Sequence, residues 1–452
     1  MITVAEILEV TGGRAFGVDP AAVFPTMVAD SRQVAPGALF CALRGERTDG
    51  HLYAVDAMAS GAGAVLVDEW TTVSPRIEVV DVRRALLAIL AARRRITGGH
   101  VVAVTGSVGK TTTKEFIAAL LSRVGPTYRS PGNMNSDVGL PMASAEWDPA
   151  ASFAVLEVAM RFPGEIHALG RAIRPDVAVV TVIGESHIGL LGSRDAIARA
   201  KSELLGALPA SGVAVLNHDD PWTSLMRLFA PARVITVGGD AGADVVVGCL
   251  EDRGLGGWRL EVAPRGKTSF DVEVVWPGQG GRMAAGLAIG AALALGVDVP
   301  AAAEALSGLQ PGEGRVRVYH HGDVVIIDDS YNAAPVSMEA ALELLSRTPA
   351  GRRVAVLGDM RELGAESAAL HRRIGQAAAR TTDILVTVGE EARLIAAGAV
   401  AAGMAPYRVL EEGEAEDALD VLRRILEPGD VVLVKASRAL GLERVVKGMK
   451  AT

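Results

Sequence analysis

The sequence predicts an α/β protein of three domains in which the two larger sheets are mostly parallel. Short apolar runs alternate with helical stretches along most of the chain, which is typical of parallel strands joined by crossover helices. A chain of 452 residues, of which 50% are hydrophobic and 22% are charged, is too long for one core and predicts two or three compact domains. A linker rich in Pro and Gly, LQPGEGR, separates two stretches that each repeat the alternation.

The first domain is expected to be a small α/β unit over residues 1–82. A helical pattern at Val4, Ile7 and Leu8 opens it, and the strand-like run AGAVLVDE lies near its end. A helix over residues 83–95 then leads into the second domain.

The second domain, residues 83–309, is expected to be a doubly wound, mostly parallel sheet. Its strands are the apolar runs VVAVTG, FAVLEV, DVAVVTV, GVAVLN and RVITVG. Between residues 243 and 275, the alternating runs WRLEV and SFDVEVVW predict a small antiparallel insert. The third domain, residues 310–452, repeats the rhythm with VVIIDDS, RRVAVLGDM, DILVTVGE and DVVLVKAS, and is expected to be a Rossmann-like α/β domain.

The composition argues against several classes of protein. The formal net charge of −8 argues against a nucleic-acid surface, whereas small anionic ligands need only local basic groups and amides. No apolar run reaches about 18 residues, so no membrane insertion is expected. The start MITVAEILEVTGG lacks the pattern of a signal peptide, which favours a cytoplasmic protein. Cys41 and Cys249 have no metal-binding spacing and are expected to be reduced core residues.

The strongest motif is VVAVTGSVGKTTT at residues 101–113, in which an apolar strand, a glycine-bearing turn and a helix follow one another. It matches the short phosphate-loop form TGxxGK[ST] and predicts binding of a nucleoside triphosphate such as ATP. Gly106 and Gly109 allow backbone amides to point at phosphate oxygens. Lys110 would meet the β and γ phosphates, and the Thr111 hydroxyl would hold Mg²⁺. The predicted nucleotide contacts in this motif are Thr105, Gly106, Ser107, Val108, Gly109, Lys110, Thr111 and Thr112.

Three further polar residues suggest the reaction class, and each also has a simpler interpretation. Glu157 interrupts the strand FAVLEVAM, where a buried charge is costly without a partner or a metal, although a strand end in solvent would also suit it. His187 follows the strand DVAVVTVIG and also fits an ordinary loop residue. Lys201 lies in phase with the apolar face of a helix, from which it also has the length to reach water. Beside the phosphate loop, the three would form a magnesium cluster near a γ-phosphate.

The motifs TGSVGKTTTKE, PGNMNSDVGLP, VIGESHIGLLGSRDAIARAKSEL and the GR before VVIIDDSYNAAP resemble the Mur ligase superfamily along nearly the whole chain. The resemblance implies a carboxylate–amine ligase. In such an enzyme ATP phosphorylates the terminal carboxylate of a UDP-linked peptide, an amine attacks the acyl phosphate, and ADP and phosphate leave.

Four other segments are similar to members that add D-alanyl-D-alanine to UDP-N-acetylmuramoyl-tripeptide in peptidoglycan precursor synthesis. They are DSRQVAPGALFCALRGERTDGH, DDSYNAAPVSMEAAL, VLGDMRELGAESAALHRRIG and VLVKASRALGLERVV. The implied partners are therefore the UDP-muramoyl peptide and D-alanyl-D-alanine, and the enzyme is expected to act as a monomer.

The resemblance also implies roles for single residues. Thr111 and Glu157 would hold one Mg²⁺ and His187 would join a second Mg²⁺ site. Lys201 matches a family lysine that CO₂ carbamylates, which turns a cation into a carboxylate. The other matches are Asp30, Ser31 and Arg32 for the uridine nucleotide; Asn133, Asn135 and Ser136 for the substrate and γ-phosphate; Arg315, Asp329, Tyr331 and Asn332 for closure over the nucleotide; and Lys435, Ser437 and Arg438 for the incoming amine. Arg438 fits a plain surface charge equally well.

The family pattern is broken at several positions, mostly by loss of asparagine. The HNxxN helix start reads Arg282, Met283, Ala284, Ala285 and Gly286, and the other departures are Ala159, Arg161, Phe162, Val182, Ala334 and Val336. Groups for phosphate and magnesium remain, whereas polar groups that would read the base and the peptide do not. Two alternatives therefore stay open: a Mur-type ligase for a different carboxylate and amine, and a nucleotide-binding regulator without turnover. Retention of Lys110, Glu157, His187 and Lys201 argues against the regulator.

Overall fold

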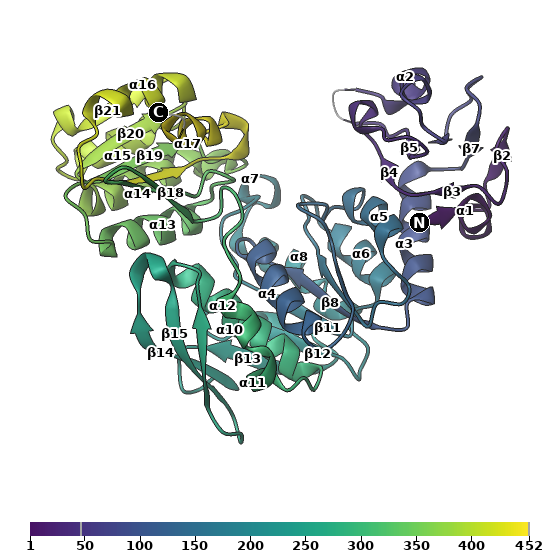
Figure 1. The fold of residues 1–452 in the computed structure, drawn as a ribbon, viewed down its shortest axis with the longest axis horizontal. Helices are drawn as coiled ribbons and strands as arrows, with labels where there is room; N and C mark the ends of the chain where they lie inside the picture. The colour runs from purple at the N-terminus through teal and green to yellow at the C-terminus, as the bar shows by residue number, and fades with distance from the viewer. Residues whose placement is uncertain (46–47, 451–452) are drawn as a thin grey trace.

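A computed structural model describes residues 1–45 and 48–450, and it confirms the three-domain α/β fold. Sheets of five, nine and six strands follow one another along the chain. Figure 1 shows the N-terminal domain in purple and the C-terminal domain in yellow-green on either side of the central domain. The domain limits at residues 82 and 309 stay predictions.

The N-terminal domain has a five-stranded sheet in the order β2-β7-β6-β5-β4, beside a two-stranded pair, β1-β3. Helix α1 begins at a capping box in which Thr3 and Glu6 satisfy each other's backbone amides. The strands are β1 (Ile2–Thr3), β2 (Arg14–Phe16), β3 (Val23–Phe24), β4 (Met27–Val28), β5 (Leu39–Cys41), β6 (Ala64–Val67) and β7 (Arg76–Glu78), and the helices are α1 (Val4–Thr11) and α2 (Ala54–Ala59).

Helix α3 (Val82–Ile96) joins the first two domains and confirms the helix predicted over residues 83–95. It begins where Asp81 accepts a 2.8 Å hydrogen bond from the Arg84 amide. Leu86 on this helix packs in the N-terminal core, whereas Leu90 packs in a core of the central domain. The helix therefore belongs to both hydrophobic cores.

The central sheet has the order β16-β15-β14-β13-β12-β11-β8-β10-β9 and is parallel from β9 to β14. The predicted antiparallel strands are present, but they are not a separate insert, because β14 pairs in parallel with β13 and so continues the sheet. The strands are β8 (His100–Thr105), β9 (Thr127–Arg129), β10 (Phe153–Glu157), β11 (Val177–Val180), β12 (Val213–Asn217), β13 (Arg233–Gly238), β14 (Val245–Asp252), β15 (Trp258–Pro264) and β16 (Phe270–Val274).

Helices cover both faces of the central sheet, which explains its uninterrupted apolar strands. On β8, Val102 and Val104 pack with α4 and α10, while Val101 and Ala103 pack on the opposite face with α6 and α8. The helices of this domain are α4 (Lys110–Ser122), α5 (Gly139–Ala143), α6 (Glu165–Ile173), α7 (Ile188–Leu191), α8 (Arg194–Ser202), α9 (Thr223–Arg227), α10 (Gly278–Ala294), α11 (Val299–Ala302) and α12 (Glu304–Ser307).

The C-terminal sheet has the order β17-β18-β22-β19-β20-β21, and only its edge strand β17 is antiparallel. Helices α13, α14 and α15 cover one face, and α16 and α17 cover the other. The elements are β17 (Arg317–His321), β18 (Val324–Asp328), α13 (Pro335–Arg347), β19 (Arg353–Gly358), α14 (Ser367–Thr381), β20 (Ile384–Val388), α15 (Arg393–Ala401), β21 (Val409–Glu412), α16 (Ala415–Ile425), β22 (Val431–Lys435) and α17 (Glu443–Lys450).

The two cysteines differ in their surroundings. Cys41 is free and buried on β5, as predicted. Cys249 is free but exposed, so the prediction that it lies in the core was wrong. It lies on the outer half of β14, next to a shift in the pairing register with β15, where neither face of the strand is covered. Across the described residues, no helix has the length and apolar character that crossing a membrane requires.

Helix α10 approaches the central sheet closely because glycines face it. A Cβ atom added at Gly290 would lie 2.7 Å from Val237 Cγ2 and 3.0 Å from Val215 Cγ1. At Gly280 on the same helix, such an atom would meet no other part of the described chain within 4 Å.

We therefore expect opposite effects of one substitution at the two positions. Gly290→Ala should lower the free energy of unfolding by about 1–3 kcal/mol through overpacking. Gly280→Ala should raise it by up to about 1 kcal/mol through better helix propensity. Chemical denaturation of both variants measures the difference, and a stabilising effect at Gly290 would contradict this packing.

Candidate active site

A cleft of about 700 Å³ lies between the central and C-terminal domains. The phosphate loop, the ends of β10 and β11 and the start of α10 line it from the central domain. From the C-terminal domain come the end of the linker, the loop after β18 and the end of β22. The predicted site residues in its wall are Ser107, Val108, Gly109, Lys110, Thr111, Thr112, Asn133, Asn135, Ser136, Glu157, His187, Arg315, Asp329, Tyr331, Asn332 and Lys435.

The phosphate loop runs from β8 into α4 and requires both glycines. Gly109 has φ of 84° at the start of α4, a conformation that favours glycine. Gly106 has φ of 149°, and a Cβ atom there would lie 1.8 Å from Thr181 Oγ1. Thr181 in turn donates a 2.5 Å hydrogen bond to the carbonyl of Val108. The end of β11 therefore fixes the shape of the loop.

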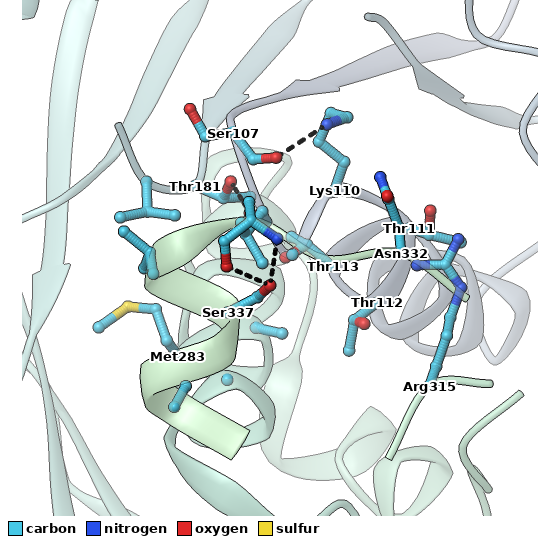
Figure 2. Close-up of a pocket in the computed structure, with 18 of the residues that line it drawn as sticks. Ser107, Lys110, Thr111, Thr112, Thr113, Thr181, Met283, Arg315, Asn332 and Ser337 are labelled. Carbon is cyan, nitrogen blue, oxygen red and sulfur yellow. Dashed lines mark hydrogen bonds between the residues drawn. The ribbon is translucent and has the colours of Figure 1, made fainter. Parts of the chain in front are cut away.

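Lys110 is turned back onto this loop. Its Nζ donates to the carbonyl oxygen of Gly106 at 2.8 Å. It also donates to the carbonyl oxygen of Ser107 at 3.3 Å (Figure 2). Burial lowers the pKa of this ammonium, and Glu157 opposes the shift. A cation at the start of a helix, among inward-facing amides, forms a binding site for an anion.

Glu157 lies at the end of β10 and is 2% exposed. Its Oε2 accepts a 2.7 Å hydrogen bond from Thr111 Oγ1, and its Oε1 accepts a 2.6 Å bond from Asn135 Nδ2. Both donors are neutral, and within the described residues no cationic side chain forms a salt bridge with this carboxylate. A buried carboxylate beside a hydroxyl, without a salt bridge, has the donor set that suits Mg²⁺.

His187 lies at the start of α7, in the cleft wall, with φ of 66°. Its Nδ1 is hydrogen-bonded to Oε2 of Glu362, which comes from the C-terminal domain. This bond lowers the pKa of the Glu362 carboxyl, with a further contribution from Arg161. The remaining ring nitrogen, Nε2, is the one left for a ligand.

Lys201 lies on α8 and is 1% exposed, so it does not reach water. It is not among the residues of the cleft wall. Its Nζ forms no hydrogen bond or ion pair with any of the residues 1–45 and 48–450. Burial sets the pKa of this amine well below its usual value, and repulsion by Lys110 adds to the effect.

The C-terminal side of the cleft carries a second set of charged groups. Lys435 Nζ donates to Asp329 Oδ2 at 2.5 Å and to the carbonyl of Asn332 at 2.9 Å. Burial raises the pKa of Asp329 despite this salt bridge. Two guanidinium groups lie close to the Tyr331 ring, with Arg315 Cζ at 4.1 Å and Arg438 Cζ at 5.0 Å from its centre. Figure 2 shows Arg315 and Asn332 in the same pocket as the phosphate loop.

Some of the predicted site residues are not in the cleft wall. Asp30, Ser31 and Arg32 lie in the N-terminal domain, where the Arg32 hydrogen bonds lower the pKa of Asp30. Ser437 is buried, and its Oγ accepts a 3.0 Å hydrogen bond from the Arg361 amide. The other predicted residues outside the wall are Thr105, Gly106, Lys201 and Arg438.

Sequence reasoning did not find three groups that shape the site. Lys114 is fully buried on α4, and its Nζ holds the carbonyls of Ser130 at 2.7 Å and Gly132 at 3.3 Å, which fixes the loop that carries Asn133 and Asn135. Glu362 binds His187. Glu185, which is 2% exposed, binds both Arg194 and Arg373 of α14. For Lys114, the one signal in the sequence is its position in phase with the buried residues of α4.

The departures from the family pattern have local partners. Arg282 donates a 2.5 Å hydrogen bond to the carbonyl of Val247 on β14. Ala334 precedes α13, where its amide donates to Ser337 Oγ at 3.0 Å and the same hydroxyl donates to the Ala334 carbonyl at 2.8 Å. Val336 packs against Gly184, at which a Cβ atom would lie 2.9 Å from Val336 Cγ2.

Comparisons with known proteins agree along the whole chain. Three family models match: the Mur ligase family catalytic domain over residues 26–95, the Mur ligase middle domain over residues 104–274 and the Mur ligase, glutamate ligase domain over residues 314–438. The UDP-N-acetylmuramoyl-tripeptide–D-alanyl-D-alanine ligase of Mycobacterium tuberculosis (strain H37Rv) is 36% identical over 100% of this chain and 98% of its own. The Escherichia coli K12 protein of the same name is 33% identical over 99% and 98%.

Solved structures give the same result. A crystal structure of MurF from Acinetobacter baumannii superposes with a TM-score of 0.89 at 30% identity, and covers 100% of this chain and 99% of that one. The MurF ligase of Thermotoga maritima, solved in complex with ADP, superposes with a TM-score of 0.81 at 29% identity over 94% of this chain and 97% of its own.

The fold and cleft define a three-domain α/β protein with a phosphate loop at the interface of two domains. With three matching domain models and relatives of at least 33% identity over nearly the full length, the chain belongs to the Mur ligase family.

The buried amine of Lys201 predicts a dependence of stability on pH. The pKa of Lys201 is lowered in the folded chain, so the unfolded chain binds more protons between that pKa and the ordinary value of about 10.4. Stability therefore rises with pH across this window, and the cost of burying Lys201 is largest below it.

Lys201→Met should stabilise the metal-free protein in CO₂-free buffer near pH 7. The gain should shrink by up to about 1.4 kcal/mol for each pH unit as the pH rises towards 10. Denaturant unfolding at several pH values measures it, and the exposed Lys267→Met serves as the matched control. A gain that does not change with pH would contradict the lowered pKa.

Proposed function

We propose that this chain is an ATP-dependent ligase that joins D-alanyl-D-alanine to UDP-N-acetylmuramoyl-tripeptide through an acyl phosphate. The observation that carries the proposal is the full-length similarity to ligases of that name, combined with a cleft that gathers the predicted nucleotide residues from two domains. We further propose that it acts in the cytoplasm, because both substrates are water-soluble precursors, and that it acts as a monomer.

The phosphate loop would bind the triphosphate of ATP. Its amides and Lys110 supply donors and a positive charge, and Lys110 would leave the carbonyls of Gly106 and Ser107 to meet the phosphates. Arg315 and Asn332 would approach the nucleotide from the C-terminal domain. This arrangement holds charge around the phosphoryl group that is transferred to the substrate carboxylate.

Two Mg²⁺ ions fit the residues beside the loop, and they would neutralise the charge that develops on the phosphoryl oxygens. Thr111 and Glu157 have the hydroxyl and carboxylate oxygens for the first ion. His187 would present Nε2 to the second ion, because Nδ1 is bound by Glu362. Lys201 has a buried amine with a lowered pKa, which favours the neutral form that carbamylation requires, and the carbamate would add a carboxylate ligand.

The two organic substrates would approach from different domains. Asp30, Ser31 and Arg32 would bind the uridine nucleotide from the N-terminal domain, and Asn133 and Ser136 would face the peptide. Lys435 and Arg438 would lie near the incoming dipeptide, with Ser437 supporting the loop beside them. Because several asparagines of the family pattern are absent, the second candidate is a ligase that acts on another carboxylate and another amine.

Phosphate release with a panel of UDP-muramoyl peptides and candidate amines tests the proposal. We expect turnover only with a UDP-muramoyl-tripeptide and D-alanyl-D-alanine, and loss of at least about 10³-fold in Lys110→Ala, because removal of the charge weakens stabilisation of the phosphoryl group. The variant should keep its thermal unfolding midpoint. Preference for another peptide or amine would favour the second candidate, and turnover in Lys110→Ala would contradict the role of this lysine.

Carbamylation of Lys201 makes a separate prediction. Lys201→Ala should be nearly inactive, and a short carboxylate such as acetate should restore part of the activity by filling the space that the carbamate would occupy. Formate and acetate should rescue better than propionate, while chloride at equal ionic strength should not rescue at all. Activity of Lys201→Ala close to that of the wild type without added carboxylate would exclude a carbamate role.

A further inference from the structure

The segment VLGDMRELG, residues 356–364, carries Glu362 and forms one of the contacts between the C-terminal domain and the His187 loop. The backbone amide of Gly189 donates to the carbonyl of Glu362 at 2.9 Å. Gly189 and Gly364 leave no room between the two loops, since a Cβ atom at Gly189 would lie 2.6 Å from the Gly364 amide nitrogen.

The carboxylate of Glu362 is held from two sides by the central domain. One oxygen, Oε2, binds His187 Nδ1, and the other, Oε1, lies 3.7 Å from Arg161 Nε. The side chain of Glu362 is 36% exposed, so it is directed by these partners and not by burial in a core. The backbone of Glu362 has φ of 63°, in the left-handed region that residues other than glycine rarely adopt.

The C-terminal domain fixes this loop from behind. Ser437 Oγ accepts from the Arg361 amide at 3.0 Å, and the Ser437 amide donates to the Asp359 carbonyl at 3.0 Å. On the far side, His371 Nε2 accepts from the Met360 amide at 3.0 Å. These hydrogen bonds fix the conformation of the loop that holds Glu362 against the central domain.

We propose that Glu362 is the positioning residue of His187: the C-terminal domain supplies the carboxylate that orients the imidazole, so the His187 site is complete only when that domain is docked. This inference rests on the proposed function for the role of His187 in turnover. A carboxylate that accepts from Nδ1–H fixes the ring orientation, and in the neutral imidazole it fixes the tautomer in which Nε2 carries no proton. Arg161 keeps the same carboxylate in place.

The first test reads the tautomer without metal, nucleotide or turnover. In the full chain labelled with ¹⁵N-histidine, two-bond ¹H–¹⁵N correlations should show His187 protonated at Nδ1, with its signals assigned by their loss in His187→Asn. Glu362→Ala should shift the ring towards the Nε2–H tautomer. Glu362→Gln should keep the wild-type tautomer, because its amide oxygen still accepts. An unchanged tautomer in Glu362→Ala would overturn the proposal.

The second test measures turnover. Glu362→Ala should lower kcat by about 10- to 100-fold with little change in KM for ATP. Glu362→Gln should lose less, and the exposed Glu366→Ala on the same loop should match the wild type. Arg161→Ala should lower kcat only when Glu362 is present, so the double variant should be no worse than Glu362→Ala. Wild-type kcat in a folded Glu362→Ala would also overturn the proposal.

The two tests separate this inference from the proposed function. A wild-type chain that does not ligate D-alanyl-D-alanine, but whose His187 tautomer depends on Glu362, would sink the proposed function and leave the positioning role standing. Full ligase activity, together with a His187 tautomer and a kcat that do not change when Glu362 is replaced, would support the proposed function and exclude the positioning role.

Discussion

The site depends on the close approach of the phosphate loop to the end of β11. Gly106 has no space for a side chain beside Thr181, and the same threonine is hydrogen-bonded to the carbonyl of Val108. Because β8 and β11 are neighbours in a parallel sheet, this one contact sets where the amides of the loop point. The positions of Lys110 and Thr111 follow, since both lie in the first turn of α4. Glu157 is brought opposite them because β10 pairs with β8 on the other side.

Local sequence was sufficient to predict this part of the molecule. A strand, two glycines and a helix within 13 residues determine the loop, and a charged residue that ends an apolar strand marked Glu157. The antiparallel strands were also predicted, but their continuation of the central sheet was not. That continuation rests on two residue pairs between β13 and β14, and nothing in either strand alone specifies them. The exposure of Cys249 was missed for the same reason, because it depends on how far β14 extends beyond the helices.

Contacts between domains were the least predictable. His187 and Glu362 are 175 residues apart, and neither lies in a pattern that points to the other. Arg161 departs from the family pattern, and the sequence alone indicates only the loss of an amide there. In the structure its guanidinium lies near Glu362, so the substitution places a charge where the two domains meet. Glu185 and Arg373 form a second ion pair across the same interface.

Helix α3 has a mechanical consequence. Its N-terminal half is part of one hydrophobic core, and Leu90, one turn further on, is part of the next. A hinge rotation of the N-terminal domain within α3 would have to remove one half of this helix from its hydrophobic core. We instead expect the N-terminal domain and α3 to move together as a rigid body, which tilts about the contact between α3 and α6. A small tilt of α3 against α6 would therefore also move the Asp30 loop, so the position of the first domain depends on the packing of the second.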